Sequence, residues 1–455
     1  MDLADDYPDS DMIGCRFLKF KTTCLLFIVA CIFQFSYLIS PWLTFFILDC
    51  VLSVYLLSLF QGNLRYLFFF HPLFVFISAP FFQIPYDEIG VGFTYLDTFN
   101  MVIDSTTLGL SSGLGEYYSD KESVFGFGKV YFGIIPIIFL PNLIAIEPEP
   151  HLLYYSMSLF SLIYVALAAF VSRFYNILTS KNLLIIALYA TVSPTFLEIN
   201  STLHRYSMLI GGLFLFLLSY IGLREKNRSK SDVFGLLIFT IISIFFIGFS
   251  KPQIIYVLIM FISLDLLFAN KLHLISRIFI RMDRRLFFVL VVFFLQIFSL
   301  FILPEEHKSI AANYGGQLTA LANVPILGFI LRLVYAVLSP FPWVGFAQWE
   351  LYGFNYMFLF VHIISAFLAA WIILSVIFSL NKIWQIEYQD RLIIIFGICV
   401  LFSINFSAIG FHVYLAPALP FLSILLSNKG LRVNAIYPLI FCITLEVVAH
   451  MARLI

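Results

Sequence analysis

Long, uninterrupted apolar runs constrain this chain more than any other feature of its sequence. They recur along all 455 residues. Many reach the roughly 17 to 25 residues that an α-helix needs to cross a hydrocarbon core about 30 Å thick. Hydrophobic residues make up 62% of the chain and charged residues 11%, whereas a soluble domain carries about 25% charged residues. The sequence therefore predicts an all-α protein, a polytopic bundle of transmembrane helices.

About fifteen such runs follow one another, and no stretch between them suits a separate soluble domain. They are 22–40, 42–60, 66–84, 130–146, 152–171, 182–199, 207–223, 233–249, 254–269, 286–303, 323–340, 355–380, 392–411, 413–427 and 434–452. We therefore treat 1–455 as a single integral-membrane domain. The first run is followed at once by the second, which favours an anchor over a cleaved signal peptide.

The distribution of Lys and Arg predicts how the helices are oriented, because both residues are enriched in cytoplasmic loops. Most of the 26 basic residues fall into one alternating set of loops, which we place in the cytoplasm. This set is Arg16, Lys19, Lys21, Arg65, Arg173, Lys181, Arg224, Lys226, Arg228, Lys230, Lys271, Arg277, Arg281, Arg284, Arg285, Lys382, Arg391, Lys429 and Arg432.

Two runs do not fit this orientation as simple spans. The runs 130–146 and 323–340 can cross only if the charge rule is broken, so we expect both to be re-entrant or interfacial. About 13 spans remain, within a range of roughly 12 to 14. Two larger loops, 85–125 and 304–353, then lie on the periplasmic side, and the first holds seven acidic residues and one lysine. Long loops between short turns are where function concentrates.

Several cations fall outside the cytoplasmic set. Besides Arg453 near the C-terminus, they are Lys121, Lys129, Arg205, Lys251, Lys308 and Arg332. Arg332 lies in "LRLVYAVLSPFPW", in the middle of an apolar run, where an arginine costs ~2.5–3.5 kcal/mol on insertion scales. The predicted orientation gathers Arg205, Lys251, Lys308 and Arg332 on the periplasmic face.

Two interpretations of these cations stay open. Lys and Arg near helix ends can reach the lipid headgroups and anchor the helix, which is a sufficient account of Arg205 and Lys251. Alternatively, cations gathered around one cavity would bind a phosphate or diphosphate, and the planar fork of arginine suits phosphate oxygens. The position of Arg332, far from either end of its run, favours the second interpretation.

Acidic and histidine side chains in the outer segments are candidates for a general base. The stretch "EEHK" places Glu305, Glu306 and His307 beside Lys308. Transfer of a sugar onto a hydroxyl needs such a group to accept the proton. Further candidates are Asp87 and Glu88 in "PYDE" and His412 in "IGFHVYLAP". A solvated loop or a helix end has the same composition, so the sequence does not decide which of these residues is the base.

Several other kinds of chemistry are not indicated. The chain has no P-loop, no GxGxxG after a strand and no HExxH motif. Its six cysteines lie in or beside apolar runs with no CxxC pair, which favours a packing role over metal binding. The formal net charge is zero, so nothing favours nucleic acid as a partner. We expect no nucleotide, metal or other cofactor.

In its number of spans, its large late outer loop and the segment "RLVYAVLSPFPW", the chain resembles the Wzy-type polymerases of bacterial O-antigen and capsule. The stretch "LHRYSML" is similar to the basic helix end of those proteins. The resemblance implies a glycosyltransferase of the inner membrane that joins undecaprenyl-diphosphate-linked oligosaccharide repeats on the periplasmic face. It also implies contact with membrane lipid and a partner protein that regulates chain length.

Carried over to this chain, the resemblance makes Arg332 and Arg205 diphosphate-binding candidates and places Glu305, Glu306 and His307 near the acceptor. Lys251 stands where some relatives have arginine, which leaves its role open. Two alternatives also stay open. A GT-C-type glycosyltransferase or O-antigen ligase would use an acidic pair such as Asp87 and Glu88. A flippase would have evenly short loops and two related halves, which this chain lacks.

Overall fold

The computed structural model describes residues 41–76, 150–200, 206–225, 228–251, 253–268, 326–338, 356–406 and 415–454. Within these ranges every regular element is an α-helix or a short 3₁₀ helix, and no strand occurs. The predicted all-α class is therefore confirmed for the part of the chain that the structure describes.

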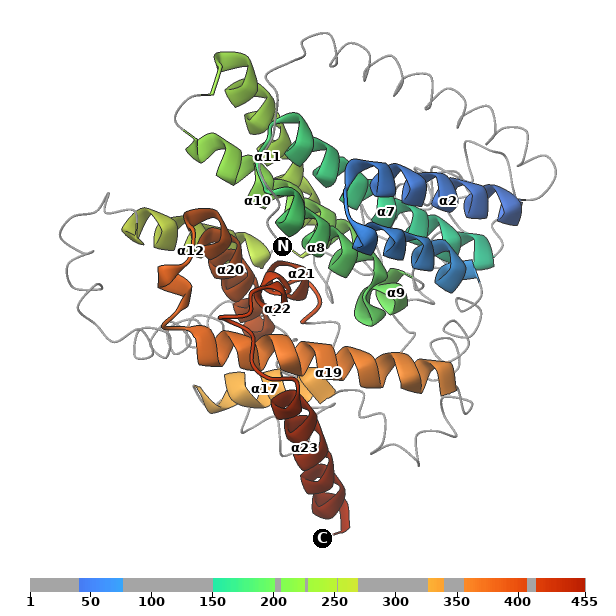
Figure 1. Ribbon diagram of the computed structural model, residues 1–455, viewed down its shortest axis with the longest axis vertical. Helices are drawn as coiled ribbons and strands as arrows, with labels where there is room; N and C mark the ends of the chain where they lie inside the picture. The colour runs from blue at the N-terminus through green and yellow to red at the C-terminus, as the bar shows by residue number, and fades with distance from the viewer. Residues whose placement is uncertain are drawn as a thin grey trace, which may run out of the picture.

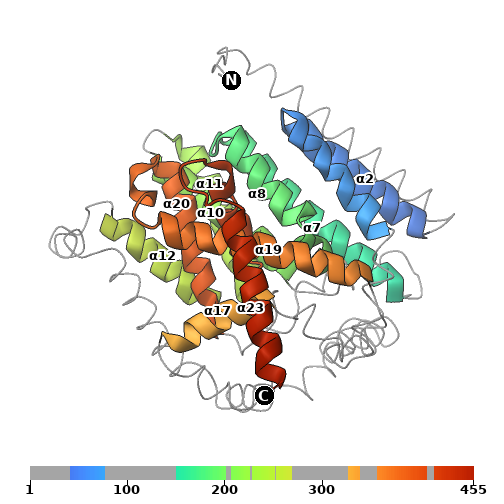
Figure 2. The same cartoon turned by 60° about the horizontal axis from the view of Figure 1, so that its bottom comes forward.

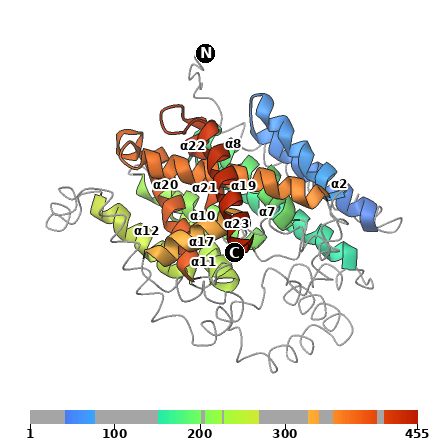
Figure 3. The ribbon, with the colours of Figure 1, turned by 90° about the horizontal axis from the view of Figure 1, so that it is seen from below.

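Nine longer helices build the described part of the molecule. They are α2 (Pro41–Leu59), α7 (Pro150–Phe174), α8 (Ser180–Val192), α10 (Tyr206–Arg224), α11 (Lys230–Ser250), α12 (Ile254–Phe268), α19 (Tyr356–Ser379), α20 (Tyr388–Leu401) and α23 (Ile436–Leu454). The shorter elements are η1 (Asn63–Phe69), α9 (Pro194–Asn200), α17 (Leu327–Leu338), η3 (Ile383–Gln385), η4 (Phe402–Phe406), α21 (Leu419–Leu422) and α22 (Ile424–Ser427). In all three views α2 and α12 lie at opposite edges, with α10 and α20 between them (Figures 1, 2 and 3).

Helix α10 packs between α7 and α11, and two adjacent glycines allow both neighbours to approach closely. A Cβ atom on Gly211 would overlap the side chain of Tyr164 on α7. On Gly212 it would lie 3.1 Å from side-chain atoms of Ile247 and Phe246 on α11. Successive positions of a helix point about 100° apart, so each glycine serves a different neighbour. Small residues at helix contacts are typical of membrane bundles.

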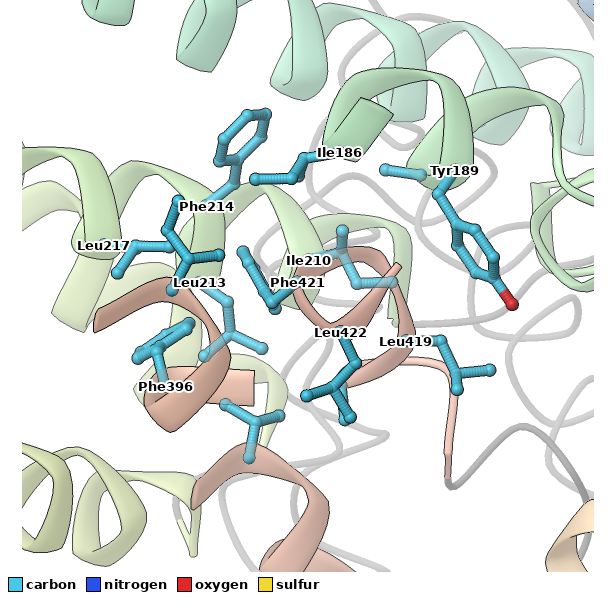
Figure 4. Packing of buried hydrophobic residues seen from close by; sticks show 14 of the residues in the cluster. Ile186, Tyr189, Ile210, Leu213, Phe214, Leu217, Phe396, Leu419, Phe421 and Leu422 are labelled. Carbon is cyan, nitrogen blue, oxygen red and sulfur yellow. The ribbon is translucent and has the colours of Figure 1, made fainter. Parts of the chain in front are cut away.

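The apolar core is centred where α8, α10, α20 and α21 meet (Figure 4). The ring of Phe421 lies 4.9 Å from that of Phe396 and 6.2 Å from that of Phe214, both edge to face. All three rings are fully buried. A Cβ atom on Gly397 would lie 2.7 Å from Leu422, so this glycine lets α21 pack directly on α20. The core therefore joins segments that are far apart in the sequence.

Ten of the predicted cytoplasmic cations lie in the described residues, and all of them are found at one end of the helices. We call this end the basic end; the ten are Arg65, Arg173, Lys181, Arg224, Arg228, Lys230, Lys382, Arg391, Lys429 and Arg432. Hydrogen bonds join its connections. Arg173 donates to the Leu59 carbonyl over 2.7 Å, Gln389 donates to the Ile177 carbonyl over 3.1 Å, and Lys382 donates to the Gly430 carbonyl over 3.3 Å.

The described helices bury polar side chains and expose apolar ones. On α11, Phe234 and Ile241 are each 67% exposed, whereas Ser243 is fully buried. Helix α23, which crosses α19 in Figure 2, exposes Ile440 and Ile443. Buried polar groups together with exposed apolar surface are the informative departure from the ordinary soluble pattern. By length and composition, one helical segment of the described residues, Lys230–Gly248, can span a membrane, and the shorter apolar helical segments found by the same criteria are 10–17 residues long.

Two predicted spans are interrupted in the structure. The run 182–199 forms α8 and α9, and the break falls at Ser193, which is extended with ψ 150°. Pro194 causes it, because a proline disfavours the helical conformation of the residue before it. The run 413–427 forms, in its described part, the two four-residue helices α21 and α22 after a turn.

The two runs that did not fit the predicted orientation have different outcomes. The run 323–340 contains α17, whose 12 residues extend about 18 Å and are too short to span. The expectation that this run is re-entrant or interfacial stays a prediction. The run 130–146 lies outside the described residues, as do the loop 85–125 and all of the loop 304–353 except 326–338.

Candidate functional site

Lys251 is a buried cation at the end of α11. It is the C-cap residue, its backbone N–H donates to the Ile247 carbonyl over 2.8 Å, and only 4% of its surface is exposed. The side-chain ammonium donates to the Tyr206 hydroxyl over 3.4 Å. The last carbonyls of a helix carry partial negative charge, which stabilises a cation at this position. The local sequence therefore explains why an ammonium is tolerated here.

Tyr206 is a residue of this site that the sequence analysis did not single out. It begins α10, is 1% exposed, and has its ring centroid 5.7 Å from the Lys251 ammonium. A cation over an aromatic ring gains roughly 0.5–2 kcal/mol, more when it is shielded from water. The ring and the hydroxyl therefore both position Lys251. The signal was available in "LHRYSML", where an aromatic follows Arg205, but tyrosine is common at membrane interfaces.

Arg332 lies on the buried face of α17. Phe329 and Ala336, which are close to it on the helix surface, are buried as well, and Arg332 itself is 7% exposed. The opposite face presents Leu327 and Ile330, which are 40% and 48% exposed. The helix thus turns its one charged side chain inward and its aliphatic side chains outward. This explains how a charged residue can lie inside an apolar run.

Arg332 and Lys251 lie at the same end of the helices, opposite the basic end. The Phe329 ring on α17 is 5.7 Å from the Phe402 ring in η4, which continues α20. The other end of α20 begins with Tyr388, which donates to Asp265 near the end of α12. The end of α12 thus lies beside the start of α20. The start of α12, which is next to Lys251, therefore lies toward the other end of α20, where η4 follows. We call the end that holds Lys251, Tyr206 and Arg332 the opposite end.

The remaining predicted site residues lie outside the described residues. They are Arg205, Lys308, Glu305, Glu306, His307, Asp87, Glu88 and His412. Their roles stay predictions. Among the predicted set, the structure describes Lys251 and Arg332 only, and it places both at one end.

The described ranges contain no group of three or more His, Cys, Asp or Glu side chains that could hold a metal ion. The described cysteines, Cys50, Cys399 and Cys442, are free thiols, and Cys399 and Cys442 belong to the apolar core. This finding concerns those ranges alone.

A second charged cluster lies at the basic end, around the carboxylate of Asp265. This group is 3% exposed and accepts from Tyr220 over 2.7 Å and from Tyr388 over 3.1 Å, and it pairs with Arg224 at 3.0 Å. Three donors satisfy the buried charge, as a carboxylate away from water requires. The cluster ties α10, α12 and α20 together, so we assign it a structural role.

The connection between α7 and α8 is tied to this end as well. Burial raises the pKa of the Tyr175 hydroxyl, the nearby Asp232 carboxylate raises it further, and Arg228 partly offsets both effects. The Tyr175 hydroxyl also lies directly on Gly235 of α11. Charges at and just before the start of α11 therefore act on a side chain of the α7–α8 connection, which fits a compact, mutually compensated end.

A third polar set was also missed from the sequence, and it joins Asp49 and His71 inside the bundle. Asp49 is the one charged residue of the run 42–60, and His71 stands alone in the run 66–84. An ionisable residue inside an apolar run is itself the signal that could have found them.

The chain matches no protein-family model, no curated protein and no solved structure. A guanidinium and an ammonium, both withdrawn from water at one end of a helical bundle, suit a phosphorylated ligand.

Proposed function

We propose that the chain is a polytopic integral membrane protein of the bacterial inner membrane, with the basic end in the cytoplasm. The exposed aliphatic and aromatic faces of α11, α17 and α23 support this, since water would not favour them. The collection of Lys and Arg at one end supports the orientation. The opposite end then faces the periplasm.

The chain acts, on this proposal, as a Wzy-type polymerase of O-antigen or capsule repeats. The glycan on one undecaprenyl diphosphate is transferred to a hydroxyl of the next lipid-linked repeat, and the lipid diphosphate leaves. Arg332 and Lys251, with Arg205 and Lys308, hold the diphosphate. A base among Glu305, Glu306 and His307 accepts the proton of the attacking hydroxyl. No nucleotide is consumed, because the lipid diphosphate already activates the sugar.

The observation that carries the proposal is the inward placement of Arg332 on a helix too short to span. An arginine buried inside a membrane-facing helix costs free energy and is by default a functional residue. Arg332 lies at the end of the bundle that also holds the buried cation Lys251. Binding of one anionic ligand would therefore explain why both cations are buried there.

A flippase for lipid-linked oligosaccharides is the second candidate, and one observation favours it. The helices are interrupted at Ser193 and in the segment 415–427. Broken helices commonly line the substrate path of transporters. The interrupted helices therefore favour transport as the second candidate function.

One experiment separates the two functions. We would delete the gene and separate the surface polysaccharide on a gel, with the gene restored on a plasmid as the control. A polymerase predicts lipid A core that carries a single repeat and no ladder. Loss of every repeat would indicate a flippase or an O-antigen ligase instead. A ladder of normal length would contradict both.

A further inference from the structure

Two guanidinium groups meet at the end of α2, although their residues are far apart in the sequence. Arg173, at the end of α7, donates from Nε and Nη2 to the Leu59 carbonyl over 3.1 Å and 2.7 Å. Arg65 of η1 donates from Nη1 to the carbonyl of Phe60, the residue after Leu59, over 3.0 Å. The carbonyls at the end of a helix attract cations. Because the two acceptors are consecutive, the guanidinium groups lie close together.

A third cation adjoins the two arginines at the start of α8. The Nη2 atom of Arg173 also donates to the Ser180 hydroxyl over 2.7 Å, and Lys181 is the next residue. Lys181 is exposed, whereas both arginines are half-buried. The elements that carry these cations pack on one another at the edge of the bundle formed by α2 (Figures 1 and 2). We call Arg65, Arg173 and Lys181 the corner cations.

No carboxylate pairs with the corner cations among the described residues. The sequences of η1, α7 and α8 contain no Asp or Glu. On α20, whose start lies at the same end, the Asp390 carboxylate accepts from the Asn182 side chain. The close acid–base pairs of the described residues join Asp49 to His71, Asp265 to Arg224 and Glu225 to Arg228. The three charges of the corner therefore have no counterion within the described ranges.

Exposed apolar side chains lie next to the corner cations. Tyr66 and Phe174 directly follow the two arginines and are 51% and 46% exposed. The apolar surface continues into the helical turns after η1, where Phe70 and Leu73 are 57% and 52% exposed. Basic side chains beside exposed aromatic and aliphatic groups are typical of segments at a membrane–water interface. The corner thus offers a charged surface and an apolar surface to one ligand.

We propose that the corner cations bind the phosphate of an anionic phospholipid, whose acyl chains lie against the apolar side chains of η1 and of the turns that follow it. Guanidinium groups bind phosphate oxygens through parallel N–H donors, and clusters of Lys and Arg next to a membrane attract anionic headgroups. A soluble phosphate would leave the apolar surface uncovered, whereas a lipid covers both surfaces. The ligand is therefore a phospholipid with a net negative charge.

This inference rests on the proposed membrane location with the basic end in the cytoplasm, and not on polymerase activity. The corner cations belong to the basic end, whereas Lys251 and Arg332 lie at the opposite end. The phospholipid is therefore a different molecule from the undecaprenyl diphosphate of the proposed reaction. Recovery of the protein in the membrane fraction of cells tests the location separately from the lipid site, and the glycan ladder tests the polymerase separately from both.

The first test measures the lipid preference of the full-length protein in detergent by native mass spectrometry. Phosphatidylglycerol and phosphatidylcholine with identical acyl chains are titrated in parallel, so the two lipids differ only in the headgroup. Each cation near a membrane surface strengthens the binding of anionic lipid roughly fivefold. The first phosphatidylglycerol should therefore bind at least about tenfold more tightly than the first phosphatidylcholine. Equal affinities for the two lipids would overturn the proposal.

Matched variants locate the site. Arg65→Gln/Lys181→Gln removes two corner charges and keeps Arg173, which ties α7 to α2. The control Lys230→Gln/Arg432→Gln removes two exposed charges elsewhere at the basic end. The corner variant should lower the affinity for phosphatidylglycerol about 10- to 25-fold, and the control should change it less than about twofold. Equal losses would indicate diffuse attraction by the whole basic end and would overturn the site.

Lys181→Glu serves if the double variant does not fold, because Lys181 is exposed and makes none of the bonds to the end of α2. It should lower the affinity for phosphatidylglycerol at least about fivefold, and an unchanged affinity would overturn the proposal.

The second test asks whether the ligand is a lipid or a soluble phosphate ester. Glycerol phosphate, the soluble part of the headgroup, competes with phosphatidylglycerol for the full-length protein. Because glycerol phosphate cannot cover the apolar surface, about a tenfold excess should leave the lipid bound. Displacement of the lipid by that excess would overturn the lipid assignment.

Discussion

The two ends of the bundle differ in the environment of their charged side chains. At the basic end, cations such as Lys382 and Arg432 are exposed, and the buried carboxylate of Asp265 is satisfied by three donors. At the opposite end, the two described cations of the candidate site, Lys251 and Arg332, are buried. A charge that is in water or fully compensated costs little, whereas a buried one has to be stabilised by its surroundings. We propose that the exposed charges of the basic end orient the chain and that the buried cations of the opposite end bind a ligand.

The largest effect is expected from Arg332→Ala. If the buried guanidinium binds a diphosphate, its removal should lower polymerisation about 10- to 100-fold, which corresponds to the ~1.5–3 kcal/mol of charge-assisted hydrogen bonds. Arg332→Lys should retain part of the activity. The glycan ladder on a gel, at matched protein levels, provides the measurement. Arg432→Ala, at an exposed arginine of the basic end, is the matched control. A normal ladder from Arg332→Ala would contradict the proposal that the buried cations of the opposite end, unlike those of the basic end, bind the ligand.

Gly211→Ala tests whether the helices at the opposite end are packed as closely as the structure indicates. The added methyl group would overlap Tyr164, so we expect a loss of about 1–3 kcal/mol in the free energy of unfolding. Thermal unfolding in detergent measures it. Gly248→Ala on α11 is the control, since its new Cβ would meet Ile255 at an ordinary 3.5 Å. There the gain in helix propensity, about 0.5–1 kcal/mol, should leave stability unchanged or raised. Equal losses for both variants would contradict the close contact.

Asp265→Asn tests the compensated charge of the basic end. The amide keeps the shape of the carboxylate but cannot satisfy Arg224 and both tyrosines, so stability should fall by about 2 kcal/mol. Ladder length per molecule of protein should remain unchanged. Ser263→Ala, at an exposed position two residues earlier on α12, should stay within about 0.5 kcal/mol of the parent. Loss of polymerisation without loss of stability would mean that this cluster has more than a structural role.

Tyr206→Phe and Tyr388→Phe remove one hydroxyl from each end. The first loses the hydroxyl contact with Lys251 but keeps the aromatic ring, which should lower polymerisation by up to about tenfold, equivalent to ~0.5–1.5 kcal/mol. The second should lower the unfolding temperature and leave polymerisation intact, because it weakens the bonds to Asp265. If both variants change stability but leave polymerisation unchanged, Tyr206 does not position Lys251 for activity.

The smallest effect is expected from Glu225→Gln. The Glu225 carboxylate pairs with Arg228, three residues later in the chain, at 2.5 Å. The Glu225 side chain is 39% exposed. The Arg228 side chain is 14% exposed, but because the carboxylate is in contact with water the pair should contribute about 0–0.5 kcal/mol and be screened by salt. Unfolding curves at low and high salt should nearly coincide for the parent and the variant. A shift of several degrees would show that the basic end is less solvated than its exposure indicates.

The fold class was predictable because hydrophobic runs and basic residues are properties of short segments. The grouping of Arg173, Arg224 and Lys382 at one end followed from the distribution of charge alone. The break at Ser193 could also have been predicted, since Pro194 stands inside the run 182–199. The division of 413–427 was harder to foresee, because its buried turns depend on packing against α8 and α20.

The amino-acid sequence alone predicted that the described part of the chain is helical, that its helices are apolar, and that the predicted cytoplasmic cations lie at one end. Those properties depend on the composition of neighbouring residues, which the chain carries with it. Only the tertiary structure decided that Tyr206 meets Lys251, that Arg332 faces inward, and that Asp49 and His71 share a hydrogen bond. Each of these contacts joins different helices, so its existence depends on helix rotation and close packing rather than on local pattern.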